Sequence, residues 1–323
     1  IQRYDVVPDN NPVIFTNNSS TYSLLKLLID RNCIPRAYVD VRDLKKIERE
    51  TLDLLEAHNI PYYPKSEIEG CDGNSEIKNI SVRTKKNIML KIKASMLCVS
   101  GGINPDIHLF TQSKGLVKWD EKILTFKPEK SFQKTITLGS VSGNFIFKKI
   151  IDEVNQKLNF IDGVNDIDLK IEVNGSEEFN IKEIWETKNN NKSLWSKSFI
   201  DLQNDVTTKD LTQAIKEGFD RIEHLKRFTT NSMGTDQGKI SSINALGIVS
   251  KLLKKSVSEV GTTTYRPPYN PVSFSAIAGR STYEFYDPER KTPIHPWHIK
   301  HNAVFEDVGQ WKRPWYYKKY ENE

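Results

Sequence analysis

The chain has 323 residues, of which 37% are hydrophobic and 10% aromatic, so it is long and apolar enough for two domains with packed cores. Its 47 basic and 42 acidic residues are interspersed and give a net charge of +5, which excludes a single-sign tail of the kind that binds nucleic acid. No run approaches the roughly 18 apolar residues that a membrane-spanning helix needs. We therefore expect a soluble globular protein that binds neither nucleic acid nor a membrane.

The cysteines indicate a reducing compartment. Cys33, Cys71 and Cys98 are odd in number and far apart, with no CxxC pair and no histidine at metal-ligand spacing. The first residues, IQRYDVVPDNNP, lack the charged-then-apolar plan of a signal peptide. We expect a cytoplasmic protein, and because the first residue is not Met, a processed or excised piece of a longer chain.

The first 41 residues predict a strand–helix–strand unit. A short apolar strand follows Pro12, a helix is expected over 21–32, and a second strand is expected over 37–41. Two strands joined in this way are parallel, with a right-handed crossover. The turn between the first strand and the helix, TNNSS at 16–20, lacks the glycines that let a backbone approach a pyrophosphate. We therefore favour a structural role for this unit over nucleotide binding.

The next sixty residues predict one helix and several strands. The helix is expected from a cap at Asp43 to residue 58, followed by an extended segment over 60–65. A hairpin is expected over 77–94 and a buried strand over 95–102. The predicted apolar face of the helix consists of Leu44, Ile47, Leu54 and Leu55.

Two glycine-containing segments are candidate ligand edges. GGINPDIHLF at 101–110 follows a strand, at the sheet edge where α/β proteins bind ligands, and a structural turn remains an equal alternative. In 135–154 a predicted strand breaks at Gly139 and Gly143 into an apolar helix, whose free N–H groups would suit a phosphate. The alternative is that these glycines only permit close helix packing.

The pattern changes after residue 160. A strand is expected over 167–173, and the Asn- and Lys-rich run after it predicts a boundary near 190–195. Thr207 and Asp210 then form a capping box for a helix that ends near Gly218. Its inward-facing side chains are Leu211 and Ile215.

The stretch from Arg227 to Tyr269 is rich in Thr, Ser, Asn and Gly beside positive charge, and we interpret it as a ligand-facing junction. A helix is expected to begin just after Lys239, and Ser256 with Glu259 predicts a second capping box. The apolar positions of the first helix are Ile240, Ile243, Leu246 and Val249.

Three histidines recur every three residues near the end of the chain, at His295, His298 and His301. Pro296 lies between the first two, and no acidic or thiol ligand stands nearby to complete a zinc site. We expect surface histidines and no metal site.

Several motifs, taken in order and spacing, resemble the alpha subunit of heterotetrameric sarcosine oxidase. They are HLKRFTTNSMGTDQGK, EVGTTTYRPPY, FSAIAG and TPIHPWHIKHNAVFEDVGQWKRPWYY, together with VIFTNNSSTY, CVSGGINPDIHLF and LGSVSGNF upstream. The resemblance covers nearly the whole chain. It implies an α/β fold that combines an incomplete thioredoxin-reductase-like dinucleotide-binding module of Rossmann type, a helical junction and the start of an aminomethyltransferase-like α+β domain.

The resemblance also implies a division of the chain. Residues 1–160 are expected to be part of a two-dinucleotide-binding-domain module, 161–200 a strand and linker segment, and 201–260 the helical junction. Residues 261–323 are expected to begin the folate-binding domain that is similar to the glycine-cleavage aminomethyltransferase.

The activity implied is that of an oxidoreductase acting on the CH–NH group of sarcosine, with glycine and hydrogen peroxide as products and the one-carbon unit passed to tetrahydrofolate. The implied partners are the beta, gamma and delta subunits. NAD would bind the alpha module and FMN the alpha/beta interface, whereas flavin oxidation, FAD and zinc would belong to other subunits. A related secondary-amine dehydrogenase of the N-methylglutamate type and a non-catalytic scaffold remain alternatives.

The resemblance also implies candidate residues for these ligands, by the positions at which this sequence matches the family's motifs. Ser140, Phe145 and Phe147 are the candidates for NAD, and Tyr269 is the candidate for folate, on which its ring would stack. We expect no catalytic residue in this chain. The candidates for the FMN phosphate are Arg227, Thr229, Thr230, Gln237 and Lys239.

Overall fold

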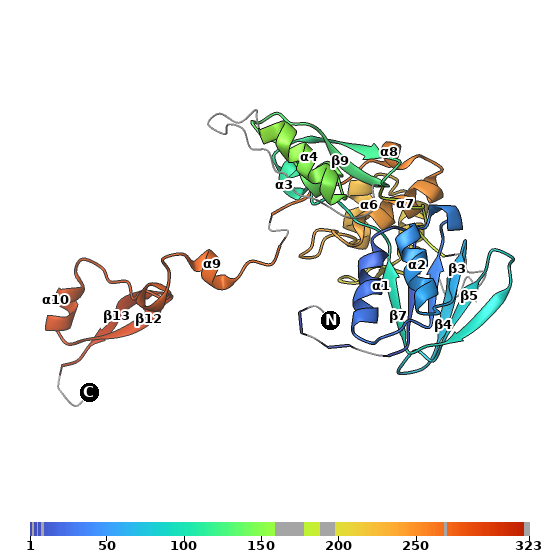
Figure 1. Ribbon diagram of the computed structural model, residues 1–323. Helices are drawn as coiled ribbons and strands as arrows, with labels where there is room; N and C mark the ends of the chain where they lie inside the picture. Colours follow the sequence, from blue (N-terminus) through green and yellow to red (C-terminus); the bar gives the residue numbers. More distant parts are fainter. Residues whose placement is uncertain are drawn as a thin grey trace. The chain divides into compact units, whose positions relative to one another are not determined.

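The computed structural model describes residues 10–158, 178–187, 198–267 and 270–319, together with residues 1, 3, 4, 6 and 7 (Figure 1). They form two compact units, Ile1–Tyr269 and Asn270–Glu323. The predicted strand over 167–173, the predicted boundary near 190–195 and the folate candidate Tyr269 lie outside the described residues.

A four-stranded parallel sheet lies at the centre of the first part of the chain. Its spatial order is β3-β2-β1-β7, and every neighbouring pair is parallel. The strands are β1 (Pro12–Thr16), β2 (Ala37–Asp40), β3 (Tyr62–Pro64) and β7 (Met96–Ser100). All residues of β1 and β2 are buried, which explains why both read as continuous apolar runs. The predicted strand–helix–strand unit and the mixed α/β class with a parallel sheet are confirmed.

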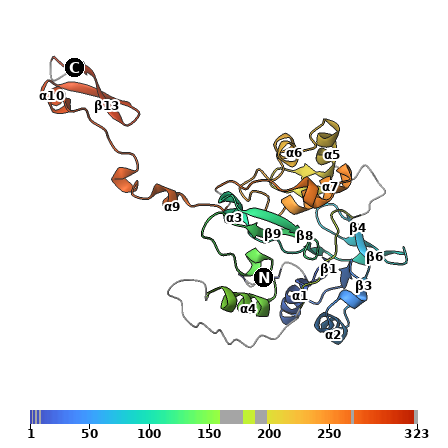
Figure 2. The same ribbon diagram turned by 90° about the horizontal axis from the view of Figure 1, so that it is seen from above.

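The two faces of this sheet are covered differently. On one face Ile14 and Tyr38 pack with residues of α1 (Thr21–Asp30) and α2 (Arg49–Ala57). On the other face Val13 and Phe15 pack against a three-stranded antiparallel sheet, which Figure 2 shows beside β1. Its strands are β4 (Glu67–Asp72), β5 (Asn79–Arg83) and β6 (Met89–Lys93). The last two form the predicted hairpin.

The single helix predicted from Asp43 to residue 58 is wrong. Asp43 does cap a short 3-10 turn, η1 (Leu44–Lys46), but the chain is then extended at Ile47 and Glu48 before α2 begins. The cause is Arg42, whose Nη1 donates to the carbonyl oxygen of Lys46 at 3.2 Å and to Glu48 Oε1 at 3.1 Å. Leu44 is consequently exposed, whereas Ile47 and Leu55 are buried and Leu54 is partly buried.

Strand β7 forms as predicted, but the expectation that it is buried is wrong, because none of its five residues is buried. It pairs with β1 alone among the described strands, so it is an edge of the sheet. Val99 on this edge is 64% exposed.

The predicted strand before Gly139 is wrong. Residues 135–138 pair with no described strand, and the chain turns instead through η2 (Gly139–Ser142) into α4 (Phe147–Leu158). Gly139 and Gly143 have φ values of 65° and 84°, which favour glycine and redirect the backbone here. The antiparallel pair upstream, β8 (Leu116–Asp120) and β9 (Thr125–Lys130), was not singled out in the sequence.

A second apolar core gathers the later helices and the β8–β9 hairpin (Figure 2). Leu225 and Leu246 are buried there with Trp119 and Phe126 of the hairpin. The other elements are α3 (His108–Gln112), β10 (Phe199–Asp201), β11 (Val206–Thr207), α5 (Thr208–Lys216), α6 (Ile222–Thr229), α7 (Ser242–Leu253) and α8 (Val257–Val260).

Both predicted capping boxes are confirmed, at Thr207 with Asp210 and at Ser256 with Glu259. Leu211 is buried and Ile215 packs against the same core, as expected. The prediction that Ile240 lies on the apolar face of the next helix is wrong, because α7 begins at Ser242 and leaves Ile240 80% exposed.

The second unit is small and contains an antiparallel hairpin. His295 is buried against Phe305, with ring centroids 4.4 Å apart, so the expectation of a surface position is wrong for this histidine. His298 Nδ1 lies 2.6 Å from the hydroxyl of Tyr317, and His301 stacks on Trp297. The elements are α9 (Phe274–Ala278), η4 (Tyr283–Phe285), α10 (His295–Lys300), β12 (Ala303–Val308) and β13 (Trp311–Tyr317).

Among the described residues there is neither a membrane-spanning helix nor a group of metal-binding side chains. None of their helices has the length and apolar character that crossing a membrane requires. No three or more of their His, Cys, Asp or Glu side chains are grouped so as to hold a metal ion.

Candidate functional site

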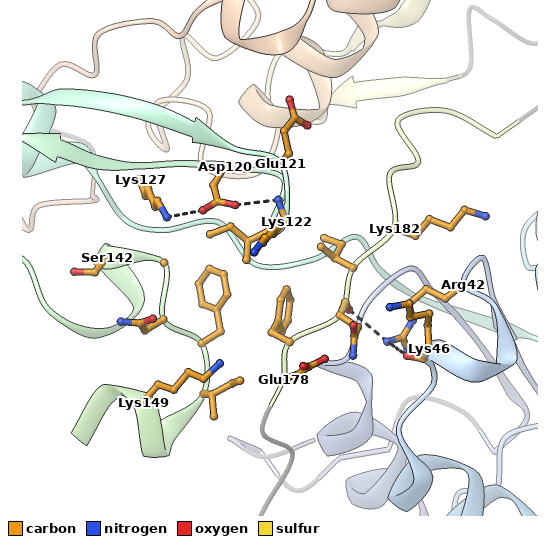
Figure 3. A pocket seen from close by; sticks show the side chains of 18 of the residues that line it. Arg42, Lys46, Asp120, Glu121, Lys122, Lys127, Ser142, Lys149, Glu178 and Lys182 are labelled. Carbon is orange, nitrogen blue, oxygen red and sulfur yellow. Dashed lines mark hydrogen bonds and ion pairs between the residues drawn. The ribbon is translucent and has the colours of Figure 1, made fainter. Parts of the chain in front are cut away.

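A cavity of about 880 Å³ opens between four segments of the first unit, and we call it the basic cavity (Figure 3). One wall follows the carboxyl end of β2, a second is the turn between β8 and β9, and a third is the loop that leads into α4. The fourth wall is residues 178–182. The charged side chains that line it are Arg42, Asp43, Lys46, Lys65, Asp120, Glu121, Lys122, Lys127, Lys149, Glu178 and Lys182.

Three of the basic side chains are paired with carboxylates. Lys65 pairs with Asp43, and Lys127 with Asp120. Although burial acts in the opposite direction, the hydrogen bond from Lys127 holds the pKa of Asp120 below its usual range. These pairs fix two sides of the basic cavity.

Arg42 is the third paired base and forms the buried floor beneath the cavity. Its guanidinium contacts Asp40 (Nη2 to Oδ2, 2.8 Å) and Glu48 (Nη1 to Oε1, 3.1 Å), and its side chain is 2% exposed. Burial raises the pKa of Asp40, and the hydrogen bonds and charge of Arg42 offset part of that rise. A buried charge of this kind is tolerated only because it is fully paired and hydrogen-bonded.

Two phenylalanines supply the apolar part of the cavity wall. Phe145 precedes α4, and Phe179 comes from the fourth wall. Their ring centroids are 5.1 Å apart with an interplanar angle of 59°, within the range of favourable aromatic pairs. The cavity therefore offers a ligand both positive charge and a ring surface.

Residues 178–187, which we call the crossing segment, pass over the carboxyl end of β1. Lys182 N donates to Asn17 O at 2.8 Å, Ser19 N donates to Asn180 O at 3.0 Å, and an isolated bridge joins Asn18 to Ile181. Ligands of open α/β sheets bind at this edge, where the strand order reverses. Here the backbone of the same chain occupies it.

The turn below the crossing segment is filled by side chains. Asn18 is fully buried, and its Nδ2 donates to Ser100 O at 3.1 Å across the end of β7. A glycine-rich turn would leave this space to a pyrophosphate. The contacts therefore favour the structural role expected for the first strand–helix–strand unit.

A second cavity, of about 690 Å³, lies beside the crossing segment, and we call it the apolar cavity. Gly101–Asn104, Trp185 and Lys239 are among the residues that line it, and Ile181 lines both cavities. Of the two interpretations left open for 101–110, the geometry supports a ligand edge for its first residues.

The structure brings one of the three NAD candidates to the basic cavity. Phe145 lines it, whereas Ser140 and Phe147 are exposed and are not part of its lining. The N–H of Gly139, a candidate phosphate donor, instead donates to Glu153 Oε2 at 2.9 Å. A carboxylate of the chain thus already occupies the position of the expected anion.

The five FMN candidates do not line a cavity together. Lys239 lines the apolar cavity, with its Nζ 3.7 Å from Asp106 Oδ2, and none of the other four lines either cavity. Thr229 Oγ1 donates to Leu225 O, and Gln237 Nε2 donates to Gly234 O. Thr230 Oγ1 donates to the carbonyl of Thr229, and Arg227 is exposed on α6. Their role stays a prediction.

Lys46, Lys122 and Lys149 also line the basic cavity, although no sequence pattern marks them as site residues. They come from η1, the β8–β9 turn and α4, and no motif links them. Their only sequence signal is the general abundance of lysine, which does not distinguish a lining residue from a solvated one.

The 101–110 segment contacts the junction from Arg227 to Tyr269 directly. The ring of His108 lies 3.8 Å from that of Tyr265, and His108 Nδ1 is 2.7 Å from Asp106 Oδ1. Tyr265 and His108 are both buried. This contact joins two sequence motifs that are separated by more than 100 residues.

We expect this contact to weaken in acid. Burial lowers the pKa of His108, despite the nearby Asp106 carboxylate. Because the folded-state pKa lies below the unfolded value of about 6.5, the stability that neutral His108 contributes is complete above the unfolded value and is lost as the pH falls through the folded-state pKa. The urea midpoint should be lower at pH 5.5 than at pH 7.5, and this difference should be smaller in His108→Gln. An equal difference in the two proteins would contradict this assignment.

The parallel sheet, with helices on one face and an antiparallel sheet on the other, defines a mixed α/β protein. Among solved structures, the L-proline dehydrogenase from P. horikoshii is similar in fold, with a TM-score of 0.51 and 17% identity over 85% of this chain and 51% of that one.

The similarities in sequence are more specific than the similarity in fold. Residues 195–280 match the model of the sarcosine oxidase A3 domain. The chain is 34% identical to the sarcosine oxidase subunit alpha of Corynebacterium sp. (strain U-96), over 76% of this chain and 27% of that protein. The sarcosine oxidase subunit alpha of Rhizobium meliloti (strain 1021) is 32% identical, over 97% of this chain and 31% of that protein. The chain is thus related to sarcosine oxidase alpha subunits, as its motifs indicated, and spans about 27–31% of the length of these relatives.

Proposed function

We propose that the chain is part of the alpha subunit of a heterotetrameric sarcosine oxidase. The complex would oxidise the CH–NH group of sarcosine, release glycine and hydrogen peroxide, and pass the one-carbon unit to tetrahydrofolate. The observation that carries the proposal is the 32% identity to an alpha subunit along 97% of the chain. We expect the complex in the cytoplasm.

The part of the reaction assigned to this chain is binding. Flavin oxidation is proposed for the beta subunit, FMN for the alpha/beta interface, and FAD and zinc for other subunits of the complex. The proposed partners are the beta, gamma and delta subunits. An NAD-type dinucleotide is proposed beside Phe145 in the basic cavity, which has the charge and the ring surface for one. Ser140 and Phe147 stay candidates for the same ligand, and the five FMN candidates stay candidates for a phosphate.

The experiment is a peroxide assay on the complex of all four subunits with their flavins. Sarcosine is compared with N-methylglutamate, with and without tetrahydrofolate. Peroxide from sarcosine supports the proposal, and turnover of N-methylglutamate without peroxide would identify the dehydrogenase alternative. Turnover of neither substrate would leave the non-catalytic scaffold as the remaining interpretation.

Tyr269→Ala in the full-length subunit should weaken tetrahydrofolate binding by about tenfold, because stacking and a hydrogen bond from the tyrosine are both lost. NAD binding should not change. Fluorescence titration of folate measures the effect, with Tyr283→Ala as the control, since Tyr283 is 95% exposed. An unchanged folate titration would remove Tyr269 from the site.

A further inference from the structure

Lys226 is a buried lysine that no carboxylate neutralises directly. It lies on α6, which gathers with α5 and α7 around the second apolar core (Figure 2), and it is only 7% exposed. Among the described residues, its ammonium group forms no ion pair and no hydrogen bond. Buried charges in proteins ordinarily have such a partner, so Lys226 is a candidate for a chemical role.

The charges around Lys226 are mostly positive. Glu223 lies one helical turn before it, but Glu223 Oε1 already accepts a hydrogen bond from the N–H of Thr264 at 3.0 Å. Arg227 is the next residue of α6, and Arg266 belongs to the segment that Glu223 binds. One carboxylate and two guanidinium groups therefore act on the ammonium group of Lys226.

These surroundings favour the neutral amine. Burial lowers the pKa of Lys226, the charge of Glu223 opposes this shift, and the charges of Arg266 and Arg227 add to it. Removal from water and a neighbouring cation are the two conditions that make a lysine nucleophilic near neutral pH. Because no described group is hydrogen-bonded to Nζ, the lone pair of the neutral amine is available to an electrophile.

The amine is accessible to a small electrophile only. Lys226 lines neither the basic cavity nor the apolar cavity, and most of its side chain is covered. Its Nζ nevertheless keeps contact with solvent. An aldehyde of one carbon meets this limit on size, and because it is uncharged the two arginines do not repel it. A cationic iminium would be repelled.

We propose that Lys226 binds formaldehyde reversibly, as a covalent adduct of its amine. The inference rests on the proposed function, because oxidation of the N-methyl group of sarcosine gives an iminium that water converts to formaldehyde and glycine. Tetrahydrofolate competes for the same one-carbon unit. The adduct on Lys226 therefore holds this unit when tetrahydrofolate is absent.

The chemistry is an addition followed by loss of water. The lone pair of Nζ adds to the carbonyl carbon, and one N–H proton moves to the oxygen, which gives Nζ–CH2–OH. The hydroxyl group and the second N–H proton then leave as water, and Nζ=CH2 remains. Neither step oxidises or reduces the protein, so formaldehyde is the only reactant required.

The test measures formaldehyde labelling of the complete four-subunit complex with its flavins. The complex is incubated at pH 7 with isotopically labelled formaldehyde and no sarcosine, and imines are trapped with cyanoborohydride. Peptide mass spectrometry then measures the methylation of each lysine. Lys226 should be methylated at least about tenfold faster than Lys216, which is exposed on α5, because a larger fraction of Lys226 is unprotonated.

Two variants separate the amine from its charge. Lys226→Arg keeps a positive charge but forms no adduct, since a guanidinium is not deprotonated, so the rapidly labelled site should be lost while labelling of Lys216 is unchanged. Lys216→Arg is the matched control and should retain the rapidly labelled site. Equal urea midpoints for the two variants show that both are folded.

Equal labelling rates at Lys226 and Lys216 would overturn the inference. An equally strong preference of acetaldehyde for Lys226 would also overturn it, because the site would then not select a one-carbon aldehyde. In a second arm, sarcosine labelled in its methyl group replaces formaldehyde, and label at Lys226 should appear without tetrahydrofolate and decrease with it. Failure of the proposed function removes label from the second arm alone, whereas failure of the inference removes it from both.

Discussion

Arg42→Ala should lower the free energy of unfolding by about 3–5 kcal/mol, the usual effect of removing one partner of a buried ion pair. The substitution leaves Asp40, which is fully buried, without its hydrogen bonds from the guanidinium. It also removes the contacts of Nη1 with Glu48 and with the carbonyl of Lys46. The extended residues between η1 and α2 lose their anchor at the same time.

Urea unfolding of the Arg42→Ala chain measures the effect, through the shift of the midpoint at an unchanged slope. Arg49→Ala is the control. Arg49 pairs with Asp53 at 2.7 Å, but its side chain is 74% exposed, so a loss of no more than about 0.5 kcal/mol is expected. Equal midpoints for the two variants would contradict the assignment of Arg42 as the buried anchor.

The parts of the fold that the sequence predicted are those with local signals. The parallel strands appear as short apolar runs bounded by turn residues, and both capping boxes follow from Ser or Thr with an acid three residues later. The hairpin of β5 and β6 was likewise marked by its polar turn. These features are determined by residues that are close together in the sequence, so they can be predicted from the sequence alone.

The features that the sequence did not predict depend on distant partners. The helix expected over 43–58 has the correct periodicity but breaks because Arg42 needs the carbonyl of Lys46, a tertiary requirement that no local pattern states. The crossing segment lies more than 150 residues from the turn that it covers. Ile240 continues the helical spacing of α7, yet it precedes the first turn and lies in solvent.

The candidate site was predicted even less completely, for the same reason. Phe145 was identified through a resemblance, and it lines the basic cavity beside Phe179, which no motif contains. Lys46, Lys122 and Lys149 come from three separate elements. A cavity formed by four distant segments has no contiguous signature, so only the tertiary structure shows which lysines share it.

Trp185→Ala should lower the free energy of unfolding by about 2–3 kcal/mol, less than for a fully buried tryptophan because its ring is partly exposed. Trp185 fixes the crossing segment to two elements. Its ring lies directly against the backbone of α7, where a Cβ atom at Gly247 would be 2.1 Å from Cδ2. Its centroid is 6.5 Å from that of Trp119 on β8. The change should shift the urea midpoint, while Phe132→Ala, at an aromatic ring that is 61% exposed, should not.

A second substitution tests the packing itself. Replacing a glycine inside a helix by alanine ordinarily stabilises by up to about 1 kcal/mol. Gly247→Ala should instead destabilise the protein, because the new methyl group meets the Trp185 ring. In the Trp185→Ala background the clash is gone, so the same change should become stabilising. A double-mutant cycle measures this reversal of sign, and additive effects would mean that the crossing segment does not rest on α7 at this glycine.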